Sequence, residues 1–154
     1  MNRNISTIFQ VITVFLLMLS GMSSTIMSQG RWENYVKEPA LLSATTNCLF
    51  CDAAGNVWFG HENGVTVYDG LSFNRITSAG MMDSPDIKSI DQDDEGNIWF
   101  ATSGGALKYD GDSYSKYTSF NGLISDVIYV VMVDSEGGIW FGTDEGVSRV
   151  YNKQ

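Results

Sequence analysis

Basic residues are scarce in this chain. It has nine Lys and Arg residues against eighteen Asp and Glu residues, which gives a formal net charge of −9. Affinity for nucleic acid depends on clustered Lys and Arg side chains that neutralise phosphates. The charge balance therefore argues against nucleic acid as a partner.

Proline is rarer still, with two residues against sixteen glycines, and aromatic residues make up 12% of the chain. Many glycines favour tight turns between short strands, and aromatic residues favour strands over a helical bundle. At 154 residues, the chain has the length of one ordinary domain. The composition favours a globular, strand-rich fold.

The apolar run near the N-terminus is short. It extends from Phe9 to Leu19, about 11 residues, whereas a membrane-spanning helix needs roughly 20. Arg3 is the only charge in residues 1–29, and this arrangement is typical of a secretory signal peptide. We expect residues 1–29 to be a signal peptide or, alternatively, an uncleaved N-terminal anchor over 5–27, and the rest of the chain to be periplasmic or secreted. The leader lacks a cysteine near its end, which excludes the usual attachment point of a lipoprotein.

Three of the four tryptophans recur at a constant spacing along the chain. Trp58, Trp99 and Trp140 are spaced 41 residues apart, and an aspartate lies six residues before each of them. Glycines recur three residues before and six residues after each tryptophan. A fixed period between about 20 and 50 residues indicates a repeat architecture.

Each full repeat is expected to contain four short strands. In the second repeat these are residues 87–92, 97–101, 105–109 and 114–118, with turns at 93–96 and at 110–111. Asp-Gly between alternating segments, as at 110–111, is a strong hairpin signal. Consecutive apolar residues at 98–100 require both faces of the second strand to be covered. Four-stranded blades stacked around an axis provide such cover, and repeats of about 40 to 45 residues are typical of propellers.

The sequence thus predicts an all-β fold of about three β-propeller blades, which form a partial propeller over residues 30–154. The blades are expected at about 45–77, 86–118 and 127–151. Residues 31–36 are expected to be the last strand of a preceding blade, because their aromatic residues follow the same 41-residue step.

Two segments resemble the two-component regulator propeller repeat. They run from Asp93 to Asp110 and from Asp134 to Val150, and residues 120–128 are similar to the glycine-leucine linker between blades of that family. In the family, such blades form the periplasmic sensor of hybrid histidine kinases that respond to glycans in Bacteroidetes-type bacteria. The resemblance implies a non-enzymatic, exported ligand-sensing module of a two-component system, with an oligosaccharide as ligand and no cofactor.

The sequence holds three blades and stops at Gln154, without a kinase or receiver. Propellers close with at least four blades, so we expect an open arc that is a fragment of a longer sensor, whose other blades or kinase part would be its partners. An alternative hypothesis is self-association through open blade faces. The chain starts with a fourth strand and ends after a third strand at 146–151, so two copies could complete each other's terminal blades in a six-bladed ring. Membrane contact is expected only through an uncleaved leader.

Cys48 and Cys51 have the spacing of a redox or zinc pair. Residues three apart on a strand point to opposite faces, and no second pair completes a zinc site. We therefore expect both cysteines to be buried and inert.

Asp91, Asp93 and Glu95 match the first half of a calcium loop, but the twelfth position is Thr102 instead of the bidentate Glu. A turn-forming Asp followed by Gly accounts for the pattern in all three repeats. No metal site is expected.

His61 is the only histidine and occupies the repeat position of Thr102 and Thr143. We expect a structural role for it. The loops between second and third strands share one face of the propeller with the linkers, however, so His61, Glu62 and Asn63 are expected on a surface that could bind a ligand. The repeated tryptophans are expected in the core, where they would not stack on sugars. No catalytic residue is assigned and the binding residues are unknown. The alternative functions are a streptogramin-lyase-like propeller enzyme, which needs a general base and usually a metal, and a structural protein-interaction module.

Overall fold

The computed structural model describes residues 33–35, 45–76 and 86–151. The chain divides into two compact units, Met1–Tyr35 and Val36–Gln154. Of the first unit only residues 33–35 are described, and they lie in no strand. The leader at 1–29 and half of the strand expected at 31–36, namely residues 31, 32 and 36, lie outside the described residues and remain predictions. Within the described part, no helix is long and apolar enough to cross a membrane.

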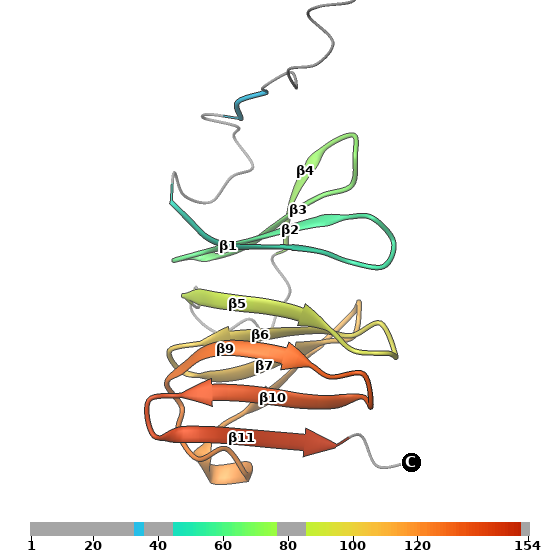
Figure 1. The fold of residues 1–154 in the computed structure, drawn as a ribbon. Helices are drawn as coiled ribbons and strands as arrows, with labels where there is room; N and C mark the ends of the chain where they lie inside the picture. The colour runs from blue at the N-terminus through green and yellow to red at the C-terminus, as the bar shows by residue number, and fades with distance from the viewer. Residues whose placement is uncertain (1–32, 36–44, 77–85, 152–154) are drawn as a thin grey trace, which may run out of the picture. The chain divides into compact units, whose positions relative to one another are not determined.

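The described part of the second unit consists of three antiparallel sheets, which we call blades 1, 2 and 3 (Figure 1). Blade 1 contains β1 (Thr46–Cys51), β2 (Val57–His61), β3 (Gly64–Tyr68) and β4 (Phe73–Ile76); blade 2 contains β5 (Ile87–Gln92), β6 (Ile98–Thr102), β7 (Gly105–Tyr109) and β8 (Tyr114–Tyr117); blade 3 contains β9 (Ile128–Val133), β10 (Gly138–Thr143) and β11 (Gly146–Tyr151). A short 3-10 helix, η1 (Ser119–Asn121), precedes blade 3. The predicted all-β partial propeller of four-stranded repeats is confirmed.

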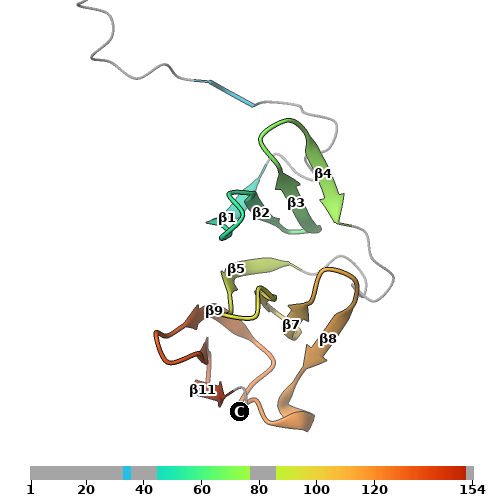
Figure 2. The ribbon, with the colours of Figure 1, turned by 90° about the vertical axis from the view of Figure 1, so that its right-hand side faces the viewer.

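The strand order within each sheet follows the chain. The first strands β1, β5 and β9 lie on one side of the stack, and the fourth strands β4 and β8 lie on the other (Figure 2). Neighbouring first strands contact each other, β1 with β5 and β5 with β9. The first strands therefore form the inner edge of the arc, as expected for a propeller.

One turn explains why aspartate and tryptophan recur in register. In blade 2, Asp93 accepts hydrogen bonds from the amides of Glu95 and Asn97, from the Asn97 side chain, and from Trp99 Nε1 at 2.8 Å. The Trp–Asp bond recurs in blade 1 at 2.8 Å and in blade 3 at 2.6 Å. In each blade the aspartate carboxylate closes the turn between the first two strands and holds the tryptophan of the second strand in place by a hydrogen bond. The carboxylate of Asp93 is thus engaged in hydrogen bonds within its own turn. The carboxylate of Asp91, the other aspartate of the calcium-loop pattern, accepts a hydrogen bond from the amide of Val133 in the next blade.

These aspartates make stability depend on pH. The hydrogen bond from Trp140, which is the largest cause, and further bonds and charge from neighbouring groups lower the pKa of Asp134 to about 2. Burial acts to raise the pKa of Asp93, but the hydrogen bonds from Trp99 and Asn97 and the charge of Lys108 together outweigh it, so this pKa is lowered as well. An unfolded aspartate titrates near about 3.9. A carboxylate whose pKa is lowered in the folded state stabilises the fold at every pH above the pKa of the unfolded chain. This stabilisation is lost as the pH falls from about 4 toward 2.

We therefore expect urea midpoints to stay level between about pH 7 and pH 5 and to fall steeply from about pH 4 to pH 2. Asp134→Asn removes one titrating group, so this variant should be weaker at neutral pH yet lose less between about pH 4 and pH 2. An equal acid slope in both proteins would contradict this assignment for Asp134.

The hydrophobic core lies between the blades. Trp99 is 1% exposed and packs on Tyr117 and, across the interface with blade 3, on Phe141, with ring centroids 5.2 and 5.7 Å away. Trp58 packs in the same way on Phe100 of blade 2 at 6.0 Å. Two tryptophans thus lie in the core as predicted. Trp140 differs, since it is only half-buried on the face of blade 3 that points away from blade 2.

Candidate functional site

One end of the blades carries both the linkers and the loops between second and third strands. The linker before blade 3 is fixed there, because Asp126 O accepts from the Gly105 amide at 2.7 Å. Ser125 Oγ donates to Asp144 Oδ1 at 2.6 Å, which ties the linker to the loop between β10 and β11. The expected common face of loops and linkers is therefore present in the described blades 2 and 3.

At this end each first strand contains a β-bulge. The pairing of β1 with β2 skips Asn47, that of β5 with β6 skips Lys88, and that of β9 with β10 skips Tyr129. These three residues, which we call the bulge residues, occupy the same position in successive repeats and all are exposed. A bulge removes a residue from the strand ladder and re-aims its side chain, and bulges are frequent beside functional sites.

The bulge residues of blades 1 and 2 are joined through one carboxylate. Asn47 Nδ2 donates to Asp86 Oδ1 at 2.8 Å and to the carbonyl oxygen of Ile87 at 3.0 Å. Lys88 Nζ lies 2.6 Å from Asp86 Oδ2, and 37% of the Lys88 side chain is exposed. Tyr129 is 57% exposed and lies on β9, the first strand that neighbours β5. An amide, a carboxylate, an ammonium group and a phenol thus line the inner edge of the arc.

This arrangement suits recognition of a polar ligand. The opposite charges of Lys88 and Asp86 largely cancel each other. The amide of Asn47 and the phenol of Tyr129 can still form hydrogen bonds with a ligand from solvent. An exposed aromatic ring beside such groups can also lie against the apolar face of a ligand.

The bulge residues were not predicted from the sequence, although a signal is present. Ile87 and Ile90 are both buried, and Ile128 and Val131 repeat this spacing of three in β9. Two core residues of one strand normally lie an even number of positions apart. An odd spacing therefore indicates an inserted residue between them.

His61 does not lie on the surface as predicted. It is 0% exposed, and its Nδ1 is 3.1 Å from the carbonyl oxygen of Thr45. The hydroxyl of Thr102, at the same repeat position, also bonds to the main chain, donating to Gly105 O at 2.6 Å. The prediction of a structural position is consistent with these bonds, and the prediction of exposure is wrong because His61 ends β2 inside the sheet.

The two cysteines are free thiols on β1. Cys48 is half-buried and faces the core between blades 1 and 2, and burial raises its pKa to about 11. A thiol with such a pKa is a poor nucleophile near neutral pH. Cys51 is exposed, so the prediction that both would be buried is wrong for Cys51. Within the described residues, no three His, Cys, Asp or Glu side chains cluster so as to hold a metal ion.

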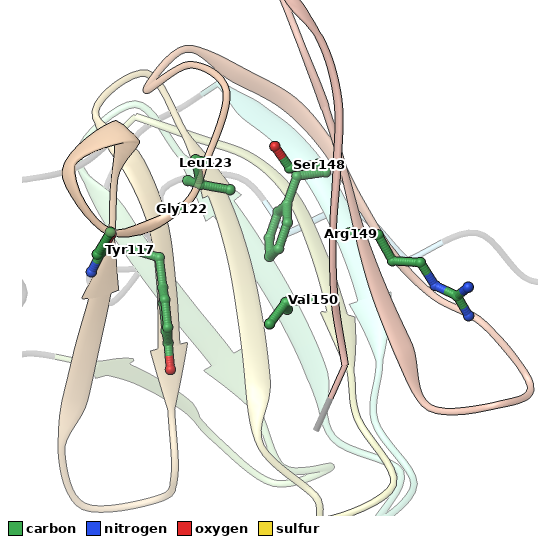
Figure 3. A pocket seen from close by; sticks show the side chains of 8 residues that line it. Tyr117, Gly122, Leu123, Ser148, Arg149 and Val150 are labelled. Atoms are coloured by element: carbon green, nitrogen blue, oxygen red, sulfur yellow. The ribbon is translucent and has the colours of Figure 1, made fainter. Parts of the chain in front are cut away.

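A separate pocket lies between blades 2 and 3 (Figure 3). Its volume is about 220 Å³, and it is lined by Tyr117, Asn121, Gly122, Leu123, Phe141, Ser148, Arg149 and Val150. Small-molecule sites usually measure about 300 to 1,000 Å³. The pocket therefore has room for a side chain rather than for an oligosaccharide.

Comparison with known proteins agrees with the repeats. Residues 81–104 and 122–145 match the two component regulator propeller family. The extracellular domain of the putative hybrid two component system BT3049 from B. thetaiotaomicron is similar over 71% of this chain, with 28% identity and a TM-score of 0.63. The corresponding domain of BT4673 from the same organism is similar over 71% of the chain, with 27% identity and a TM-score of 0.61.

The chain spans only 16% of the length of each of these two domains. A streptogramin B lyase is similar over 80% of this chain and 45% of its own, with 18% identity and a TM-score of 0.57, a likeness that extends to the fold alone. No curated protein matches the chain significantly.

Proposed function

Because the chain contains repeats of the two-component regulator propeller family, we propose that it is a non-enzymatic, exported ligand-sensing module. It works as part of a larger two-component sensor that responds to extracellular glycans. The similarity to extracellular domains of two B. thetaiotaomicron hybrid two component systems supports this role. The leader at 1–29 would direct the module across the inner membrane.

The bulge residues are the proposed contact surface for an oligosaccharide. Sugars offer many hydroxyl groups and an apolar ring face, so a sugar site needs donors, acceptors and an exposed aromatic side chain. Asn47, Asp86 and Lys88 supply the polar groups in one connected row, and Tyr129 supplies the ring. The repeated tryptophans are unsuited to this role, since Trp58 and Trp99 are packed between blades.

A propeller lyase is the main alternative function. It would need a general base within reach of its substrate, and the single histidine, His61, is fully buried. The similarity to the lyase is also weaker in sequence than the similarity to the sensor domains. A module that only docks onto other proteins is the third alternative.

Titration calorimetry of the full chain with neutral and acidic oligosaccharides tests the proposal. We expect saturable binding that Tyr129→Ala weakens about fivefold to tenfold, as the loss of one aromatic contact predicts. Phe120→Ala is the matched control, because Phe120 is 97% exposed on η1 and lies outside the bulge residues. This control should bind like the parent protein.

Two results would overturn the proposal. The first is the absence of saturable binding to any oligosaccharide. The second is equal weakening by both substitutions, which would place the ligand elsewhere. Turnover of an oligosaccharide or of a streptogramin would favour the enzyme instead.

A further inference from the structure

The site formed by the bulge residues and Asp86 offers a ligand a defined set of hydrogen-bond acceptors. Both hydrogens of the Asn47 amide nitrogen are used, since Nδ2 donates to Asp86 Oδ1 at 2.8 Å and to the carbonyl oxygen of Ile87 at 3.0 Å. The side-chain oxygen of Asn47 has no hydrogen-bond partner within the described part of the chain. Toward a ligand, the Asn47 side chain can therefore only accept.

The carboxylate of Asp86 keeps part of its accepting capacity. A carboxylate offers about four lone-pair sites, and the contacts from Asn47 and Lys88 occupy one each. The Asp86 side chain is 31% exposed, so a ligand can reach the remaining sites. A ligand group that contacts Asp86 must donate a hydrogen bond, because an ionised carboxylate only accepts.

The donors of the site come from Lys88 and Tyr129. The ammonium group of Lys88 has three N–H donors, of which its contact with Asp86 Oδ2 at 2.6 Å engages one. The phenol of Tyr129, which is 57% exposed, can donate or accept. The site thus combines acceptor-only atoms with a few donors, and its cation is already paired with a carboxylate.

This combination matches hydroxyl groups better than carboxylates or sulfates. A hydroxyl group both donates and accepts, so neighbouring hydroxyls of a neutral sugar can donate to Asn47 and Asp86 while they accept from Lys88. An anionic group only accepts. It could pair with Lys88, but it would then lie beside the oxygens of Asp86, whose charge repels it.

The surrounding charge also disfavours an acidic ligand. Lys88 is the only Lys or Arg on the first strands β1, β5 and β9, which are described in full. The loops between second and third strands at the same end, residues 62–63, 103–104 and 144–145, carry no basic residue and three acidic ones, Glu62, Asp144 and Glu145. Negative charges gathered at one end repel an approaching anion, over about 8 Å at physiological salt.

We propose that the site selects neutral oligosaccharides over acidic ones and that Asp86 determines this preference. The inference rests on the proposed function and concerns which glycans the same site accepts. The carboxylate of Asp86 accepts from sugar hydroxyls, while its charge neutralises Lys88 and repels an anionic ligand. Asp86 is therefore the specificity-determining residue of the site.

Matched pairs of ligands test this preference in the full chain. Hexasaccharides of galacturonate, mannuronate and glucuronate carry a carboxylate on each sugar, and chemical reduction of these carboxyl groups gives neutral hexasaccharides with the same linkages. Titration calorimetry at physiological salt compares the two members of each pair. We expect the neutral member to bind at least about tenfold more tightly than the acidic member, the size of one unfavourable charge contact near a protein surface.

Asp86→Asn removes the charge and keeps the shape of the side chain. We expect this variant to bind the acidic member about tenfold more tightly than the parent protein does, because Lys88 is then free to pair with a carboxylate of the ligand. Binding of the neutral member should weaken by about threefold, since an amide is a poorer acceptor than a carboxylate. Adding Lys88→Gln to Asp86→Asn should cancel the gain for the acidic member.

Glu145→Gln is the matched control for Asp86→Asn. It removes one negative charge at the same end of the blades, but from the exposed loop between β10 and β11 and not from the inner edge. The affinities for both members of a pair should stay within about twofold of the parent values, because salt screens a charge that does not contact the ligand.

The outcomes separate this inference from the proposed function. Equal or tighter binding of the acidic member by the parent protein would overturn the neutral preference and leave the sensor function in place. An unchanged ratio of affinities in Asp86→Asn, or the same change in Glu145→Gln, would overturn the assignment to Asp86. Saturable binding of neither member of any pair would overturn both the inference and the proposed function.

Discussion

Trp99→Ala is expected to lower the free energy of unfolding by about 3–5 kcal/mol, the usual cost of removing a large buried aromatic side chain. Trp99 is 1% exposed and packs on Phe141 and Tyr117 at the interface of blades 2 and 3. Its Nε1 also donates to Asp93 at 2.8 Å, so the substitution leaves a buried carboxylate with one donor fewer. Urea unfolding followed by circular dichroism measures the loss.

Trp99→Phe separates the two contributions. The phenyl ring keeps most of the packing and removes the donor to Asp93, so this control should lose about 1–3 kcal/mol, the cost of a buried group left short of a partner. An equal loss in both variants would show that the hydrogen bond, and not the packing between blades, dominates at this position.

The repeat made most of the fold predictable. Strands expected at 87–92 and 105–109 coincide with β5 and β7, because the alternation of apolar residues and the Asp-Gly turns are local signals. The burial of Trp99 followed from consecutive apolar residues, which have no solvent-facing side to occupy. Local chemistry repeated three times thus predicted the stacking of the blades.

Other features depend on contacts that no local pattern describes. His61 replaces a threonine in the repeat, and the burial of its ring results from packing at the end of β2. Trp140 follows the repeat in sequence but is half-buried, because it lies on the face of blade 3 that points away from blade 2, where the guanidinium of Arg149 stacks 4.5 Å from its ring. The repeat predicts equivalent residues, whereas the position of a blade in the arc decides their exposure.

The candidate site was missed for a related reason. A bulge changes the direction of one side chain without changing the composition of the strand. Lys88 and Tyr129 therefore look like ordinary polar and aromatic strand residues in the sequence. The odd spacing of the buried residues around them is a sequence signal of an inserted residue, and the pairing register shows that both are left out of the ladder at the same end of their blades.

The second large effect is expected at Gly105, at the start of β7. Its φ of 115° lies in the region that favours glycine, and an added Cβ would overlap the backbone oxygen of Tyr117 on β8. Backbone strain of about 1–3 kcal/mol at such a φ adds to a clash that only a shift of β8 could relieve. We therefore expect Gly105→Ala to cost about 3 kcal/mol or more.

Gly111→Ala is the matched control for Gly105→Ala. Gly111 has a φ of 101°, and a Cβ there would meet nothing within 4 Å, so only the backbone term of about 1–2 kcal/mol applies. Urea unfolding of both variants measures the difference, which reports how firmly β8 is held against β7. Equal losses would mean that β8 moves aside at little cost. The fourth strand would then be a weakly attached element of its blade.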